Sequence, residues 1–278
     1  MLGAQMSLQG FGSMAFTLAA GALATLAWWL GYAVYLVSFA SAAIGVALLP
    51  AGPDDGASTG AEPSAPAPRE GLSLGHPLPV GLVALLTLLC LACAAPWGGM
   101  SLHCSANGIG GSGLTGLVLG CIDAGMVLGG AISPRLARAL RENTIFVLFL
   151  GVAAGLLAMG LARNGALMCI AALVFGLSYA CIYPRVLALL GDLLSPDALP
   201  AAMALESALT SLGYTLGTPL IQAVGVVWPG HAATLGFYVM SALAAAIAAL
   251  LAVTRLEARA LGGAAGPAPP RGLNALVS

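Results

Sequence analysis

The chain has very few charged side chains: only 7% of its 278 residues are Asp, Glu, Lys or Arg, and none is a lysine. A soluble globular domain carries roughly 25% charged residues. Charges this scarce cannot cover the surface of a water-soluble body of this size. Their scarcity excludes a soluble enzyme, a nucleic-acid-binding protein and a disordered chain, and the bilayer is therefore the expected solvent.

Patterns that carry chemistry are also missing. Nothing in the chain resembles a hydrolase triad, a phosphate-binding loop or a zinc site. The pair Cys90 and Cys93 lies inside an apolar run, with no second cysteine pair and no histidine cluster beside it. We interpret these cysteines as small packing residues. The prediction is that the chain is not an enzyme, binds no metal, cofactor or nucleic acid, and has the lipid bilayer as its partner.

What the chain does have is long apolar runs. A helix that crosses roughly 30 Å of hydrocarbon needs about 20 apolar residues, and about eight runs come close to or exceed that length. Barrel strands would alternate between apolar and polar residues, whereas these runs are continuously apolar, so we expect an all-α, polytopic membrane helix bundle. The runs lie near residues 6–26, 30–49, 78–96, 114–132, 145–161, 166–183, 201–227 and 232–253.

Composition divides the chain into four parts. Residues 1–50 hold two expected spans, and residues 77–257 hold six. Between them, residues 51–76 are rich in proline and charge, which predicts an extramembrane linker. The proline-containing stretch 258–278 is interpreted in the same way, as a flexible tail.

The arginines set the orientation. With the N-terminus in the cytoplasm, Arg163 alone falls outside the cell and every other arginine falls on the cytoplasmic side. Cytoplasmic loops carry the excess of Lys and Arg in membrane proteins. We therefore expect both termini and the linker in the cytoplasm.

One segment carries a family resemblance. Residues 129–138 resemble the signature loop of the major facilitator superfamily: a Gly, three residues, Asp-Arg, one residue and Gly-Arg. Gly130, Arg135 and Arg138 match, whereas Pro134 and Ala137 replace the Asp and the second Gly. Such degeneracy is typical of the family's second copy, which lies in the cytoplasmic loop between helices eight and nine.

The layout around the linker strengthens this resemblance. If the linker matches the one between the family's two six-helix halves, the first two spans resemble helices five and six and the last six resemble helices seven to twelve. The resemblance implies secondary active transport of a small solute by alternating access in a bacterial inner membrane, with export favoured. The first run lacks the Gly-Pro motif of drug/proton exporters, which weakens drug export. The alternative is a truncated, non-transporting remnant or a membrane partner protein.

Two carboxylates fall inside apolar runs, where an ionisable group is costly and is a functional candidate by default. Asp123 lies between Gly120 and Gly125. Burial disfavours the ionised form of a carboxylate, which suits a group that loads and releases a proton during transport. The alternative is a structural acid that a neighbouring helix satisfies.

Glu206 lies about two turns into the seventh run. One reading is a gating ion pair with an arginine such as Arg135, and the favoured reading is a structural Glu that reaches toward the cytoplasmic surface. His103, by contrast, flanks an outer turn, where we expect it in water. The uncharged residues best able to line a substrate cavity include Tyr179, Tyr214 and Gln222.

The family's translocation path lies between two six-helix halves, and the first four helices have no counterpart in this chain. We therefore expect the reading frame to continue upstream of Met1 for roughly 100–130 residues, enough for four more spans. The genomic DNA upstream would show this.

Topology can be tested directly. Single-cysteine variants at positions 138 and 231, labelled on intact cells with an impermeant thiol reagent, should react at 231 only, because Arg138 is expected inside and His231 outside. Labelling at 138 without labelling at 231 would reverse the orientation.

Overall fold

A computed structural model describes residues 2–48, 77–195, 198–227 and 232–264. The expected linker 51–76, which includes His76, lies outside these ranges. So do His231 and the tail from residue 265. Every regular element in the described ranges is a helix. The helices are α1 (Leu2–Leu26), the 3-10 helix η1 (Trp28–Tyr35), α2 (Leu36–Leu48), α3 (Pro77–Ala92), α4 (Ala94–Ala106), α5 (Ser112–Leu140), the 3-10 turn η2 (Arg141–Asn143), α6 (Thr144–Leu161), α7 (Gly165–Leu193), α8 (Leu199–Val227), α9 (Ala232–Thr254) and α10 (Leu256–Ala264).

Four helical stretches in the described part of the chain are long and apolar enough to cross a membrane. They are Pro77–Ala106, Ser112–Leu161, Gly165–Leu193 and Thr234–Thr254. The second stretch contains both α5 and α6, which η2 separates. The prediction of an all-α chain with several apolar helices of membrane-spanning length is confirmed for the described residues, and the count of about eight spans stays a prediction.

Several helices differ from the expected runs. The segment 129–138, which we expected to open a loop, is helical, because α5 continues through Pro134 to Leu140. Arg138 Nε donates to the carbonyl of Pro134 at 3.3 Å, one turn back on the same helix. The first seven residues of the expected flexible tail, 258–264, are also helical, because α10 packs back on α7 and buries Ala260.

The third run breaks into α3 and α4 at Cys93. Pro96 lies three residues later and has no N–H group to donate to the carbonyl of Ala92. A proline inside a helix removes one backbone hydrogen bond and crowds the carbonyl four residues earlier, which explains the interruption.

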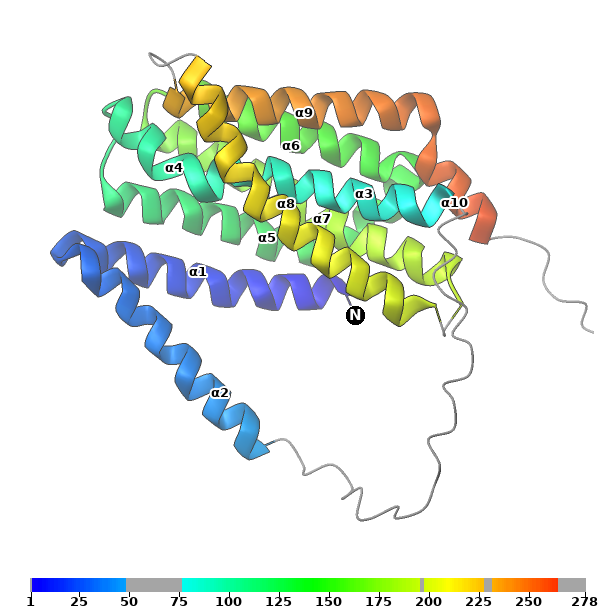
Figure 1. The fold of residues 1–278 in the computed structure, drawn as a ribbon, viewed down its shortest axis with the longest axis horizontal. Helices are drawn as coiled ribbons and strands as arrows, with labels where there is room; N and C mark the ends of the chain where they lie inside the picture. The colour runs from blue at the N-terminus through cyan, green and yellow to red at the C-terminus, as the bar shows by residue number, and fades with distance from the viewer. Residues whose placement is uncertain (1, 49–76, 196–197, 228–231, 265–278) are drawn as a thin grey trace, which may run out of the picture.

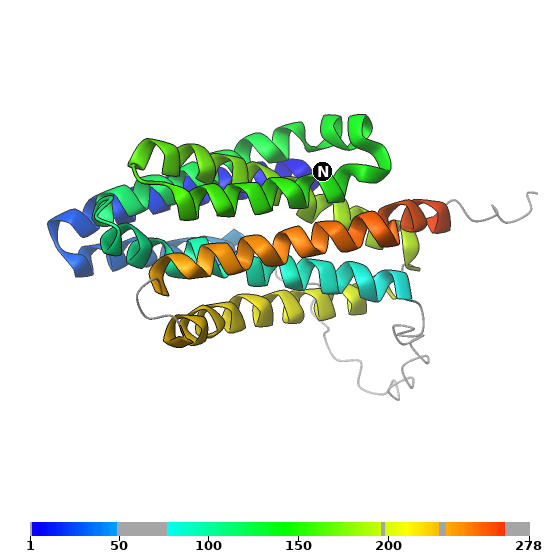
Figure 2. The same ribbon diagram turned by 90° about the horizontal axis from the view of Figure 1, so that it is seen from above.

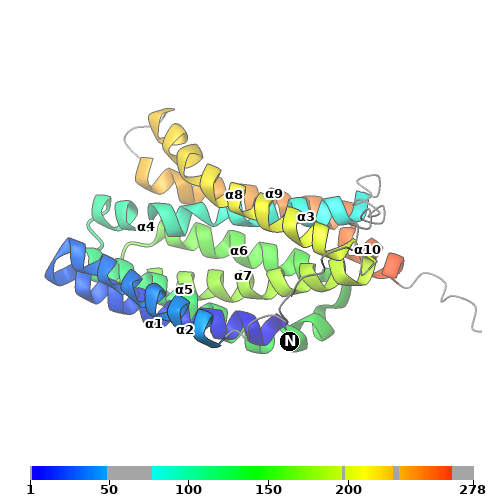
Figure 3. The same ribbon diagram turned by 60° about the horizontal axis from the view of Figure 1, so that its bottom comes forward.

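The helices run side by side along the long axis of the molecule, except that α8 crosses the others obliquely and α2 diverges from them (Figure 1). Contacts link α1 to α5, α5 to α7, α7 to α6 and α6 to α9. Figure 2 shows α9 between α6 and α3, with α8 on the far side of α3. In Figure 3, α5, α6 and α7 separate α1 and α2 from α8 and α9.

Glycines allow α5 to approach helices on two sides. A Cβ atom on Gly116 would lie 2.7 Å from the Cα of Gly21 on α1, too close for any side chain. On the other side, a Cβ on Gly125 would meet the backbone of α7 at Leu173, and a Cβ on Gly176 of α7 would meet the carbonyl of Ile122. This is the small-residue packing of membrane helices.

Gly176→Ala should destabilise the protein by about 1–3 kcal/mol, because its methyl group would collide with backbone rather than with a movable side chain. Gly191→Ala on the same helix is the matched control. A Cβ there faces open space, so alanine should be neutral or stabilising by up to about 1 kcal/mol through helix propensity. Thermal unfolding in detergent measures both, and equal melting temperatures for the two variants would contradict the contact.

Candidate functional site

Asp123 lies at the interface between α5 and α1 and is only 3% exposed. Thr17 Oγ1 of α1 donates to its Oδ2 at 3.1 Å, and the hydroxyl of Ser13 is a second hydrogen-bonding neighbour. Nearby, Ser7 Oγ of α1 donates to the carbonyl of Val127 at 2.9 Å. A neighbouring helix therefore satisfies this acid, as the structural alternative expected. The partners are neutral hydroxyls, which can donate to the carboxylate and accept from the protonated acid.

Tyr179 and Tyr214, two of the candidate cavity residues, are brought together by α7 and α8. Their phenolic oxygens lie 2.8 Å apart and share a hydrogen bond. The ring of Trp97, from α4, meets both rings and that of Phe175 edge to face, with centroid distances of 5.7–6.1 Å. Trp97 and Tyr214 remain 40% and 38% exposed, so the rings form a partly open aromatic face.

Glu206 joins this group through Tyr183. Tyr183 lies one turn after Tyr179 on α7, with ring centroids 6.5 Å apart, and its hydroxyl donates to Glu206 Oε1 at 2.8 Å. We call Trp97, Phe175, Tyr179, Tyr183, Tyr214 and Glu206 the tyrosine cluster. Its exposed part, at Trp97 and Tyr214, offers π faces and a hydroxyl group to a solute, whereas the Glu206 carboxylate is buried behind Tyr183.

The structure shows neither of the contacts that we expected for Glu206, and its role stays a prediction. The residue is 2% exposed, so it does not reach toward water. It does not pair with Arg135 either: Arg135 is exposed on α5, and the salt bridge recorded among the described residues joins Arg185 to Glu257. Tyr183 of α7, and not an arginine, is the side chain that donates to Glu206.

Other predicted residues lie apart from the cluster. Gln222 is exposed, about two turns beyond Tyr214 on α8. In the signature segment, Gly130 is buried and Arg138 is exposed. His103 was expected in water but is buried on α4, where its Nδ1 lies 3.1 Å from Thr234 Oγ1 and its ring lies 4.8 Å from that of Phe237.

Sequence reasoning missed Glu257. This residue is buried at the start of α10, where Arg185 Nε donates to Oε1 and the backbone N–H of Ile145 donates to Oε2, both at 2.8 Å. Arg185 also donates to the carbonyl of Arg141 at 3.4 Å. We call this set the Glu257 clamp, because it ties α10 to α7 and to the start of α6. An acid between the two arginines that follow the last apolar run, Arg255 and Arg259, was the available signal.

Across the described ranges, no group of three or more His, Cys, Asp or Glu side chains is placed to hold a metal ion. Comparisons of the chain with protein-family models, with curated proteins and with solved structures give no match. The resemblance of residues 129–138 to a transporter family therefore stays a prediction.

Tyr183→Phe should destabilise the protein by about 1–3 kcal/mol, because it leaves the buried Glu206 carboxylate without this donor. Adding Glu206→Met should recover part of the loss, since both polar groups are then removed together. Tyr238→Phe is the matched control: its hydroxyl donates to the neutral carbonyl of Gly160, and its loss should cost less. Unfolding in detergent measures all four proteins, and a Tyr183→Phe variant as stable as the parent would contradict the assignment.

Proposed function

We propose that the protein moves a small solute across the membrane by alternating access, as a secondary transporter with the layout of major facilitator helices five to twelve. The observation that carries this proposal is Asp123, a carboxylate 3% exposed in the middle of an apolar, membrane-length helix. An acid at that depth is costly to keep, which favours a functional role.

The position of Asp123 supports a coupling role. Asp123 lies on α5, after the linker, whereas its hydrogen-bond partners lie on α1, before the linker. Alternating access requires one group of helices to rock against another. A proton bound at Asp123 turns one carboxylate oxygen from an acceptor into a donor toward one of the two hydroxyls, Thr17 or Ser13, and this change alters the α1–α5 contact.

The tyrosine cluster supports a solute-binding role. It joins three helices, and its aromatic face is partly open at Trp97 and Tyr214. Binding sites for small molecules combine apolar and aromatic walls with a few polar groups that orient the ligand. The proposed location is the bacterial inner membrane with both termini in the cytoplasm, and the proposed direction is export.

Asp123→Asn should abolish proton-coupled transport while leaving folding and insertion intact, because asparagine keeps the shape but carries no exchangeable charge. The purified chain is reconstituted in liposomes with an acidic interior and an entrapped pH-sensitive dye. Sugars, amino acids, organic acids and organic cations are then added in turn. At least one solute should dissipate the gradient with the parent protein and not with Asp123→Asn.

Asp192→Asn is the matched control, since Asp192 is an exposed acid near the end of α7; it should transport normally. If no solute class dissipates the gradient with the parent protein, transport by this chain is wrong, and the remnant or partner alternative stands. If Asp123→Asn transports with unchanged proton coupling, transport stands and the role of Asp123 is wrong.

A further inference from the structure

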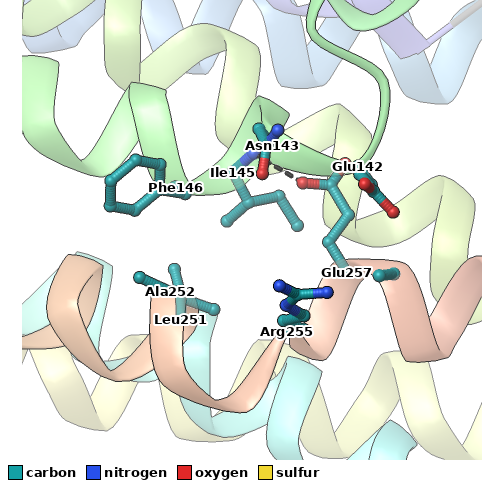
Figure 4. A pocket seen from close by; sticks show the side chains of 9 residues that line it. Glu142, Asn143, Ile145, Phe146, Leu251, Ala252, Arg255 and Glu257 are labelled. Carbon is teal, nitrogen blue, oxygen red and sulfur yellow. Dashed lines mark hydrogen bonds between the residues drawn. The ribbon is translucent and has the colours of Figure 1, made fainter.

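A cavity of about 270 Å³ opens between the start of α6, the end of α9 and the start of α10 (Figure 4). Glu257 of the clamp is among its lining residues, whereas Asp123 and the tyrosine cluster are not. Its residues divide into two kinds. The apolar wall includes Phe146, Leu251 and Ala252, and the polar rim includes Glu142, Asn143 and Arg255.

Glu257 lines the same cavity, but its charge is already compensated. One carboxylate oxygen accepts from Arg185 and the other from the backbone N–H of Ile145. The charges left to meet a ligand are the exposed Arg255 and the exposed Glu142. Figure 4 shows the Arg255 side chain reaching from the turn between α9 and α10 into the gap toward α6.

The cavity also lies at a defined depth. Phe146 belongs to the membrane-length stretch Ser112–Leu161, and Leu251 and Ala252 belong to Thr234–Thr254. The rim residues lie at the ends of these helices. Glu142 and Asn143 belong to η2, just before α6, and Arg255 lies between α9 and α10. A site that is apolar on the helix side and charged at the helix ends matches the level of lipid headgroups.

We propose that this cavity binds the headgroup of an aminophospholipid, with a primary ammonium group as in phosphatidylethanolamine. Arg255 and Asn143 donate to the phosphate, Glu142 accepts from the ammonium group, and the acyl chains lie along Phe146, Leu251 and Ala252. The proposal requires a membrane location only and does not depend on transport.

The charges select among lipids. The cavity lining holds one arginine and one carboxylate that the salt bridge of the clamp does not use, a pair matched to a zwitterion and not to a purely anionic headgroup. A choline headgroup carries the same net charge but has no N–H to donate to Glu142, so it loses that charge-assisted hydrogen bond. Free phosphate would leave the apolar wall unused.

The test titrates the purified full chain in detergent with dihexanoyl phosphatidylethanolamine, phosphatidylcholine or phosphatidylglycerol, or with inorganic phosphate, and follows the melting temperature, which rises with any ligand that binds the folded state. Phosphatidylethanolamine should bind about tenfold more tightly than phosphatidylcholine, the equivalent of one charge-assisted hydrogen bond. Glu142→Gln should remove this preference.

Arg255→Asn should weaken binding of both zwitterionic lipids about tenfold. Arg255 has a φ of 47°, and asparagine tolerates that left-handed backbone better than most residues. Arg259→Asn, an exposed arginine of α10 outside the cavity lining, is the control and should bind like the parent. If Arg255→Asn does not fold, Glu142→Gln alone tests the proposal, because Glu142 is exposed and its replacement should not disturb folding.

Three results would overturn the proposal. Equal binding of phosphatidylethanolamine and phosphatidylcholine by the parent protein would remove the role of Glu142. Tighter binding of phosphatidylglycerol would indicate an anionic-lipid site. A melting shift with inorganic phosphate as large as that with the lipid would indicate a free-phosphate site.

Discussion

The backbone contacts of α5 set the arrangement of the other helices. In hydrocarbon, helices gain nothing by hiding apolar surface from water, so close packing and hydrogen bonds must hold them together. Gly116 allows α1 to touch α5, and Gly125 with Gly176 allows α7 to touch it from the other side. At this distance the short hydroxyl side chain of Thr17 reaches Asp123. A larger residue at these glycines would move α1 or α7 outward and break the polar contacts.

The three acids that are buried in the described part of the chain have different hydrogen-bond partners. Asp123 and Glu206 lie within long helices and accept from the hydroxyls of Thr17 and Tyr183. Glu257, at the end of the bundle, instead has an arginine and a backbone N–H. A full ion pair requires desolvating two charges, which is cheaper where the arginine is still partly exposed, as Arg185 is at 18%. The partners of the deeper acids are neutral, so a change of protonation there leaves no unpaired cation behind.

Run length and continuous apolar composition predicted the helical fold, and the position of Asp123 between glycines predicted a buried acid. The partners of Glu206 could not be predicted, because they depend on how α8 is rotated against α7, and one sequence does not give that rotation. Helix ends were also misplaced: the expected runs end at residues 132 and 183, because apolar composition stops there, whereas α5 and α7 continue through Pro134 and Pro184. Glu257 lies between the last apolar run, 232–253, and the expected tail, 258–278, so composition gave no sign that it packs against other helices.

The Glu257 clamp explains how the polar end of the bundle keeps an unfavourable backbone. Arg141 and Arg255 have φ values of 51° and 47°, and they are the non-glycine residues with positive φ in the described part of the chain. Such conformations cost of order 1 kcal/mol or more each and persist only where surrounding contacts impose them. Thr144 Oγ1 donates to the carbonyl of Arg141 at 2.7 Å and Arg185 donates to the same oxygen at 3.4 Å. Glu257 lies two residues after Arg255 and accepts from the backbone N–H of Ile145, at the start of α6. The clamp therefore joins the segments on which both turns lie, and these turns carry Glu142 and Arg255 to the rim of one cavity.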